Sequence, residues 1–308
     1  MGNFFWGLLT FYEKMPALEY FQTHLLMNML VFAVTYTTTY LVVYVWLKDY
    51  LHLRKMNRKF PSRYLVVKEM SRCVSSVVIL TVEEVVMFEL WKRGYVLNNL
   101  SFSPNIWETH KFWIVTLLLL SVFWGEAHFY WTHRLLHSFP LLYKSVHKVH
   151  HESLNPDPYS GISFHPVEAS LYFSALPGLS LFPGPVPSWL YRFFSWGLLV
   201  GPCFVHLSYD IPMPRFALSV SFSNPFPYVK LGFHIPDPIS INVKDGRIQR
   251  NNTPVRLDEL GLLSRMCYRH FIHHSKYSMY PNGRHRAYNF GGFPFWDKLC
   301  GTEYYPPA

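Results

Sequence analysis

The chain has 308 residues, of which 50% are hydrophobic, 19% are aromatic and only 15% are charged, and its formal net charge is +9. Soluble domains usually carry about a quarter charged residues, so the composition excludes an ordinary soluble enzyme and predicts a membrane protein with a substantial polar portion. No recognition motif accompanies the positive charge, which argues against a nucleic-acid partner. The four cysteines are far apart and form no C-x2-C pair. We therefore expect reduced thiols and neither a disulfide scaffold nor a zinc ribbon.

The first apolar segment runs from His24 to Leu47 without a charged residue. At about 1.5 Å per residue, a helix of this length crosses a hydrocarbon core of roughly 30 Å, so we predict a membrane span. The residues before it, 1–23, lack the basic stretch and small-residue cleavage site of a secretory signal peptide, and we expect the segment to be retained.

Two further apolar segments follow, Val74–Trp91 and Phe112–Trp131. Three carboxylates interrupt the former: Glu83, Glu84 and Glu89. Carboxylates at membrane depth must face protein, water or a partner, so this segment either spans poorly or lies against other helices. The latter gains polar side chains toward its far end: Glu126, His128 and His133. This pattern predicts that the membrane ends near those residues.

The segment Ala169–Val205 is apolar but is broken by prolines and a glycine at 182–188. Each arm has fewer than about 20 residues, so a re-entrant or tilted pair fits as well as two full spans. From Asp210 onward the chain is polar. We predict an all-α integral membrane protein with about four transmembrane or re-entrant helices and a cytosolic, histidine-rich cap.

Orientation follows from the basic residues. Eight Lys and Arg lie between Lys48 and Arg72 against two acidic residues, a net +6, and the positive-inside rule places this loop in the cytosol. The N-terminus and the 92–111 connection are then lumenal, and the histidines that follow are cytosolic. Attraction of a solvated loop to anionic headgroups explains the same charge. The sequons at Asn99 and Asn251 fall on opposite predicted sides, so neither is used.

Eight of the 16 histidines form three boxes: His133-x3-His137, His147-x2-His150-His151 and His270-x2-His273-His274. Residues three or four apart share a helix face, so each box presents its imidazoles in one direction. One ion needs about three or four protein ligands, and eight therefore predict two metal ions acting together. Polar tips at a membrane interface suffice to explain the lone histidines: His24, His52, His110 and His285.

The boxes and their flanking residues resemble the membrane fatty acid hydroxylase and sterol desaturase superfamily. The matching stretches are Tyr130-Trp-Thr-His-Arg-Leu-Leu-His137, Tyr143-Lys-Ser-Val-His-Lys-Val-His-His-Glu152, His165-Pro-Val-Glu168, His270-Phe-Ile-His-His274, Asn289-Phe-Gly and Phe295-Trp-Asp-Lys-Leu-Cys-Gly-Thr302. Together they cover residues 112–302, in an order that is specific to this superfamily.

The resemblance implies a di-iron centre that uses O2 to oxidise a C–H bond of a lipid, with electrons from cytochrome b5 or a reductase, in the endoplasmic reticulum membrane. By position, it implies ten metal ligands: His133, His137, His147, His150, His151, His165, His206, His270, His273 and His274. A substrate-side or capping role is the alternative for His165 and His206. The implied domains are a lumenal segment (1–23), membrane helices with the basic loop (24–111), a catalytic domain (112–302) and a tail (303–308).

The residues themselves leave the metal open, because imidazole binds zinc as well as iron, and purified protein could carry zinc. An unactivated C–H bond nevertheless requires a metal or cofactor, since no side chain supplies that chemistry. Five carboxylates are near enough in sequence to orient the imidazoles, with plain surface salt bridges as the alternative: Glu126, Glu152, Asp157, Glu168 and Asp297.

Two features depart from the family pattern: the long stretch 210–266 and the polar insertion 276–285. His128 could supplement a ligand or line a cavity.

The sequences of the boxes are closest to the sterol C-4 methyl oxidase branch, with fatty acid or sphingolipid hydroxylation as the runner-up. A non-catalytic, zinc-binding membrane protein is the alternative of another class. Five aromatic residues are candidates for shaping the substrate site, with packing or an interfacial aromatic belt as the alternative: Phe173, Phe182, Trp189, Trp196 and Tyr209.

Overall fold

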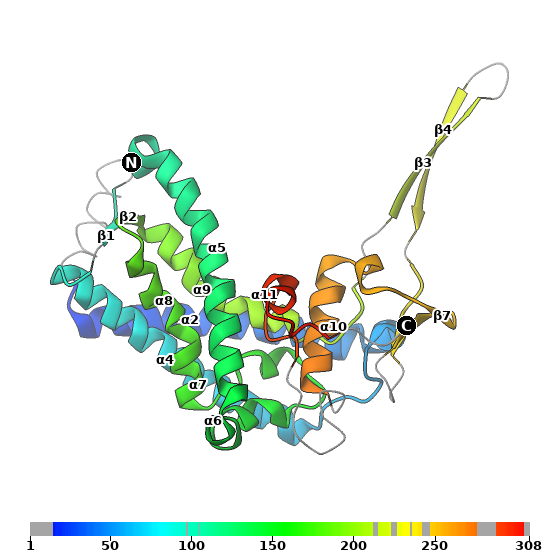
Figure 1. The fold of residues 1–308 in the computed structure, drawn as a ribbon, viewed down its shortest axis with the longest axis horizontal. Helices are drawn as coiled ribbons and strands as arrows, with labels where there is room; N and C mark the ends of the chain where they lie inside the picture. Colours follow the sequence, from blue (N-terminus) through cyan, green and yellow to red (C-terminus); the bar gives the residue numbers. More distant parts are fainter. Residues whose placement is uncertain are drawn as a thin grey trace.

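The computed structural model describes residues 15–96, 98–103, 105–211, 215–222, 227–234, 236–241, 247–275 and 288–304. It is mainly helical, with long helices toward one end and a smaller helical and stranded part toward the other (Figure 1). Several predictions fall on residues outside this description: most of the segment 1–23, the whole insertion 276–285 with His285, and the end of the tail.

The first long helix, α2, runs over Ala17–Tyr40 and continues as a π-helical turn, η1, over Leu41–Trp46. Pro16 precedes it, where a missing N–H costs nothing because the first turn has no intrahelical acceptor. Glu19 lies in its first turn, but from His24 onward α2 and η1 carry no charged residue, and together they are long and apolar enough to cross a membrane. Short helical turns, α3 (Lys48–Leu51) and η2 (His52–Arg54), begin the basic loop.

Helix α4, Arg63–Lys92, begins earlier than the apolar pattern suggests, because the Ser62 side chain accepts a hydrogen bond from the Leu65 N–H and caps its N-terminus. Glu84, one of the carboxylates that interrupt its apolar sequence, is completely buried. It accepts hydrogen bonds from Asn28 of α2 and Arg192 of α9, at 3.0 and 2.7 Å. The carboxylate therefore faces protein, one of the environments predicted for it.

Helix α5, Ile106–Ser138, is the second helix in the described part of the chain that is long and apolar enough to cross a membrane. His110 interrupts its helical dihedrals near the start. The 33 residues of α5 extend about 50 Å, more than the roughly 30 Å of a hydrocarbon core. Its last turns, with His133 and His137, can therefore lie beyond that core. The number of spans beyond α2 and α5 stays a prediction.

The predicted hairpin is asymmetric. Its first arm is only α7 (Pro166–Phe173), α8 (Ala175–Gly178) and the turn η5 (Leu179–Leu181), and eight residues of α7 extend about 12 Å. The second arm is the single helix α9, Ser188–Val205. The first arm is too short and too broken to span, so this geometry favours the re-entrant form.

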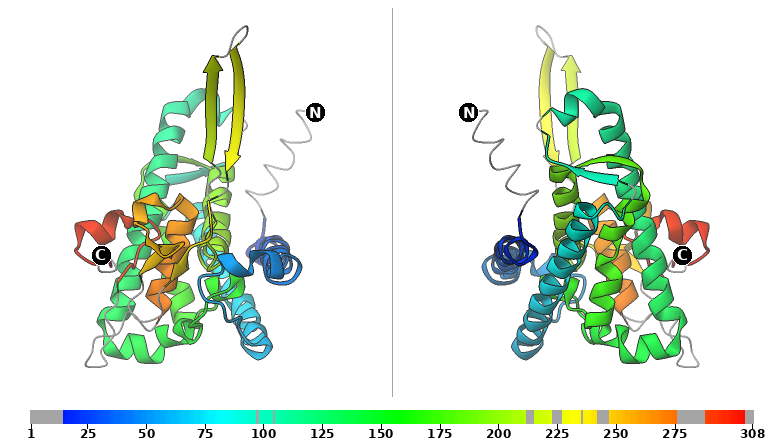
Figure 2. Two further views of the ribbon diagram at one scale, coloured as in Figure 1. Left: turned by 90° about the vertical axis from the view of Figure 1, so that its right-hand side faces the viewer. Right: turned by 90° about the vertical axis from the view of Figure 1, so that its left-hand side faces the viewer.

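The described residues are mostly helical, as predicted, but they also form three small sheets that the all-α prediction does not include. The strands β1 (Asn98–Ser101) and β2 (Gly184–Pro187) pair in parallel. The strands β3 (Arg215–Phe222) and β4 (Pro227–His234) form an antiparallel hairpin that projects from the helices (Figures 1 and 2). The third sheet contains β5 (Ser240–Ile241), β6 (Ile248–Arg250) and β7 (Thr253–Pro254). Strands therefore contribute to the segment after Asp210.

The remaining elements bring the third histidine box against the first two. After the turn η6 (Leu257–Glu259), α10 runs over Leu262–His274, and α11 over Pro294–Leu299 follows. Helix α6 (Pro140–Ser145) joins the first two boxes. The second box lies in the 3₁₀ turn η3 (His147–Glu152), which is followed by the 3₁₀ turn η4 (Pro158–Ile162). All four cysteines are free, as expected.

Candidate metal centre

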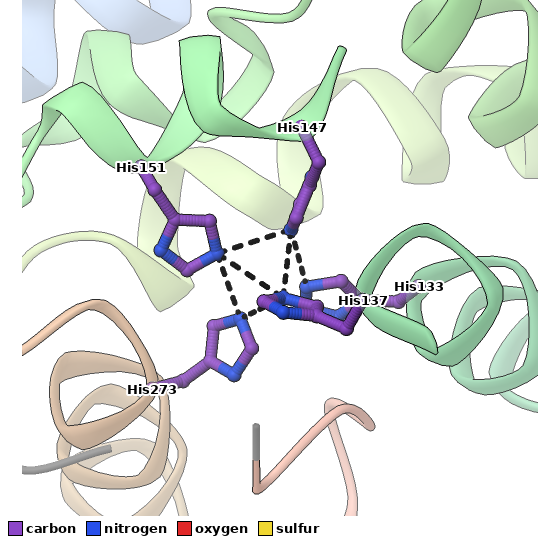
Figure 3. A group of neighbouring side chains, drawn as sticks. All are labelled: His133, His137, His147, His151 and His273. Atoms are coloured by element: carbon purple, nitrogen blue, oxygen red, sulfur yellow. Dashed lines mark hydrogen bonds between the residues drawn. The ribbon is translucent and has the colours of Figure 1, made fainter. Parts of the chain in front are cut away.

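Nine histidines form two compact groups. The first group contains His133, His137, His147, His151 and His273, and the second contains His150, His206, His270 and His274. Within each group the candidate ligand atoms lie within 4.8 Å of one another. Figure 3 shows the first group, in which side chains from α5, η3 and α10 converge from three directions. Except for the partly buried His137, the nine imidazoles are buried.

The histidines of the second and third boxes divide between the two groups. The pairs four residues apart, His133/His137, His147/His151 and His270/His274, each stay within one group, whereas His150 and His273 point to the other group from their own box. On α10, residues four apart are offset by about 40° around the axis but neighbours by about 100°, so His273 diverges from His274. The expectation that each box faces one direction is therefore wrong.

In several of these imidazoles, the Nδ1 nitrogen forms a hydrogen bond to the surrounding chain, and the other ring nitrogen, Nε2, points into the group. Four of them donate to backbone carbonyl oxygens: His133 to Phe290 (2.8 Å), His273 to Tyr288 (2.7 Å), His206 to Pro202 (2.8 Å) and His274 to Ser153 (3.1 Å). A carbonyl oxygen can only accept, so these four imidazoles carry their proton on Nδ1 when neutral. Their Nε2 atoms then hold a lone pair, two in each group.

The Nε2 atoms converge at short range. In the first group, His147 Nε2 lies 2.9 Å from His137 Nε2 and 3.0 Å from His151 Nε2. In the second group, His270 Nε2 lies 2.7 Å from His206 Nε2 and 2.9 Å from His274 Nε2. Lone pairs that face one another at this distance repel unless a proton or a cation lies between them. The donor set therefore fits one metal ion in each group.

Burial keeps these imidazoles neutral. Loss of solvation lowers the pKa of His206 to about 3 and holds the pKa values of His147, His150, His151, His270 and His274 well below the usual range, with neighbouring imidazoles adding to the effect for all of them. A metal binds the deprotonated nitrogen, so the site does not have to lose protons before binding an ion near neutral pH.

His165 is the one predicted ligand that the structure leaves out of both groups. Its Nδ1 instead accepts a hydrogen bond from the Val167 N–H at 3.2 Å and caps the N-terminus of α7. This matches the capping alternative. His128 is also outside the groups, and its Nε2 lies 2.9 Å from Ser174 Oγ.

Of the five carboxylates expected near the site, Glu168 contacts an imidazole directly, with Oε1 2.7 Å from His147 Nδ1. Asp297 contacts the site indirectly: its carboxylate accepts a hydrogen bond from the Phe290 N–H, and the Phe290 carbonyl oxygen accepts one from His133. Glu126 accepts from the Phe293 N–H. Glu152 forms ion pairs with Lys68 and Arg72, and Asp157 caps η4. The salt-bridge alternative therefore holds for Glu152.

A cavity of about 440 Å³ reaches both groups. Its walls come from α5, α7, α9 and α10, and its inner end is formed by His133 and His147 of the first group and His150, His206 and His270 of the second. Most of the remaining lining is apolar, including Phe129, Leu136, Phe164, Phe194 and Met266. An apolar cavity that ends on convergent polar groups is typical of a small-molecule site.

The five aromatic residues proposed to shape the substrate site do not line this cavity. Phe173 and Tyr209 are buried in two separate apolar cores, Phe182 and Trp196 pack against the first of these cores, and Trp189 is exposed. The packing alternative therefore holds for Phe173, Phe182, Trp196 and Tyr209, whereas Trp189 neither lines the cavity nor belongs to a core. The lining glycines of α5 and α9 were missed, because a glycine in an apolar helix carries no sequence signal for a cavity.

In the described part of the chain, these features define a mainly helical protein with two membrane-length helices and two histidine groups that could each hold a metal ion. Residues 118–226 match the family model described as fatty acid hydroxylase, which includes the first two boxes and His206. A Delta(7)-sterol 5(6)-desaturase of Aspergillus fumigatus is 29% identical over 39% of this chain and 35% of its own length. Lathosterol oxidase of Rattus norvegicus is 33% identical over 34% of each chain, and a fatty acid hydroxylase of Mycosarcoma maydis is 32% identical over 46% of this chain and 36% of its own.

Over residues 118–226, about a third of its length, the chain is similar to the fatty acid hydroxylase and sterol desaturase superfamily. It spans about a third of the length of the curated relatives that it matches. No solved structure matches the chain.

Proposed function

We propose that the chain is an oxidoreductase that oxidises a C–H bond of an apolar lipid, a sterol, by hydroxylation or desaturation, with O2 as co-substrate. The observation that carries this proposal is the continuity of one apolar cavity with both histidine groups. An aliphatic substrate in this cavity lies directly against the metal site, and water has few polar partners along the walls.

Two iron ions, one held by each histidine group, would supply the oxygen chemistry that side chains lack. The chain itself contributes position and exclusion of water. Carbonyl oxygens of Phe290 and Pro202 and the Glu168 carboxylate hold imidazoles by their Nδ1 atoms, which fixes the direction of each Nε2 lone pair. The apolar lining keeps the reacting carbon in a dry environment, which prevents competing reactions with water.

The same proposal places the protein in the endoplasmic reticulum membrane, with the histidines toward the cytosol. Support comes from the two membrane-length helices and from the basic loop, whose charge the positive-inside rule assigns to the cytosol. A cytosolic electron donor, cytochrome b5 or a reductase, would reach the site from that face.

A fatty acid or sphingolipid substrate is the second candidate, and the similarity to a fatty acid hydroxylase favours it. The sterol C-4 methyl oxidase branch, by contrast, has no support from the relatives named above, two of which are a sterol 5(6)-desaturase and a lathosterol oxidase. Zinc fits the same nitrogen ligands as iron, so a non-catalytic zinc protein is the alternative of another class.

Lipid profiling of cells that lack the gene tests the proposal, because the accumulated precursor identifies the substrate. We expect the wild-type chain to restore the profile and His150→Ala to fail, since this variant loses one of four nitrogens in the second group. Membrane insertion and protein level of the variant should match the wild type. Restoration by His150→Ala, or an unchanged lipid profile in the deletion, would contradict the proposal.

A further inference from the structure

One face of α9 forms a wall of the cavity. Phe193, Gly197 and Gly201 are spaced by four residues, share a helix face and all line the cavity. Val122 and Gly125 of α5 also line the cavity. Along α9, the two glycines lie between the exposed Phe193 and the end of the helix, where His206 lines the same cavity.

Neither glycine is explained by packing. A Cβ atom placed on Gly197 or Gly201 would meet no atom within 4 Å. At Gly161, by contrast, a Cβ atom would lie 2.8 Å from the Pro202 backbone, and at Gly125 it would lie 3.2 Å from the Phe194 ring. Glycine inside a helix costs about 1 kcal/mol relative to alanine. No neighbouring atom requires a glycine at 197 or 201. The effect of the two glycines is therefore a wider cavity.

The outer rim of the cavity is apolar and exposed. Val122 is 53% exposed and Phe193 is 65% exposed. Val122 and its exposed apolar neighbours Leu119 and Phe123 belong to α5, which is long and apolar enough to cross a membrane. In a bilayer, an opening with such a rim faces lipid chains rather than water.

We infer that a flat, fused-ring lipid enters sideways from the bilayer between α5 and α9 and lies against Gly197 and Gly201, with the carbon to be oxidised toward the histidines. Two positions without a side chain, about 6 Å apart along the helix, make this wall flat. A rigid ring system needs such a wall, whereas a single acyl chain passes beside a side chain by rotating its bonds. Gly197 and Gly201 therefore determine specificity for ring-fused substrates. This inference rests on the proposed function.

Photolabelling of the full chain in phosphatidylcholine nanodiscs tests it without requiring turnover. The probes are a diazirine derivative of cholesterol and a diazirine derivative of palmitate, and labelled peptides are located by mass spectrometry. The variants are Gly197→Leu and Gly201→Leu, with Gly197→Ala and Gly201→Ala as smaller steps. Val200→Leu is the matched control, because Val200 is on α9 but does not line the cavity.

We expect the sterol probe to label α5 and α9 in the wild type. Labelling should fall about tenfold in the leucine variants, because the added side chain occupies the space of the ring system; this loss corresponds to about 1.4 kcal/mol of binding free energy. The alanine variants should fall between, Val200→Leu should match the wild type, and palmitate labelling should change little. Leucine is a better helix former than glycine, so loss of folding is not expected, and the alanine series gives a graded readout if a leucine variant misfolds.

Unchanged sterol labelling in both leucine variants would overturn the inference. An equal loss of palmitate labelling would overturn the fused-ring assignment and would show that acyl chains use the same part of the cavity. The metal content of the same wild-type sample distinguishes failure of the proposed function from failure of this inference. A chain that binds no metal contradicts the proposed function, whatever the labelling shows.

Discussion

The Glu168 carboxylate accepts a hydrogen bond from the His147 imidazole, with 2.7 Å between Oε1 and Nδ1, and both side chains are buried. His147 thereby presents Nε2 to the other imidazoles of the first group, 2.9 Å from His137 and 3.0 Å from His151. A carboxylate on the far nitrogen orients the ring and makes its ligand nitrogen more basic.

Glu168→Ala removes this orientation. We expect metal affinity to fall about 10- to 100-fold, as loss of such partners does in other metal sites. Chelator competition on the purified protein measures the change. Glu152→Ala is the matched control, because Glu152 pairs with Lys68 and Arg72 at a partly exposed position and touches no imidazole in the described part of the chain. Equal losses in both variants would remove the special role of Glu168.

Asp297 organises the turn that holds His133. It accepts from the Phe290 and Gly291 N–H groups, each at 2.9 Å, and from the buried Arg269 at 2.8 Å. Asp297→Asn should destabilise the protein by about 1.5–3 kcal/mol, because the buried Arg269 guanidinium then keeps only Glu303 as a carboxylate partner. Thermal unfolding in detergent measures this effect. Asp258→Asn breaks only an exposed pair with Arg256 and should leave the unfolding temperature nearly unchanged.

Helices α2, α4 and α9 meet at the Glu84 carboxylate, which pairs with Arg192 at 2.7 Å. Glu84→Ala leaves a mostly buried cation unpaired, so we expect a loss of about 3–5 kcal/mol in unfolding free energy. Glu89→Ala, on the same helix, removes partly exposed pairs with Lys92 and Arg93 and should cost less than about 1 kcal/mol. A comparable drop in melting temperature for the two variants would contradict the assignment of Glu84 as the link between these helices.

His165 and His206 separate a capping role from a ligand role. His165→Ala should leave metal content unchanged and cost about 1 kcal/mol of stability, since it removes the cap of α7. His206→Ala should lower metal affinity, because the second group keeps only three nitrogens. Metal analysis after gel filtration measures both. Metal loss in His165→Ala would restore this residue as a ligand candidate.

The sequence pattern predicts the long helices and the clustering of the boxes, because uncharged runs and repeated histidines are local properties. The distribution of His150 and His273 between the groups is not local, since it depends on how η3 and α10 are turned against α5. His165 shows the same limit. The His-Pro sequence at 165–166 matches the family motif, yet the backbone turns the His165 side chain toward the Val167 N–H.

The cavity could not be read from the sequence either. Large aromatic residues such as Phe173 and Tyr209 were candidates for substrate contact, with packing as the alternative, and they fill apolar cores. Gly197 and Gly201 line the cavity through the absence of a side chain, which only the placement of the opposing helix reveals. The strands after Asp210 were missed, since the prediction treated that polar stretch only as a cap.

The stoichiometry of bound metal tests the central claim most directly. After anaerobic loading with ferrous iron and removal of excess metal, the two histidine groups predict about two ions per chain. His150→Ala and His206→Ala in one chain should leave about one ion, because the first group keeps all five imidazoles. A wild-type value near one or zero would contradict a two-metal site, whichever lipid the cavity binds.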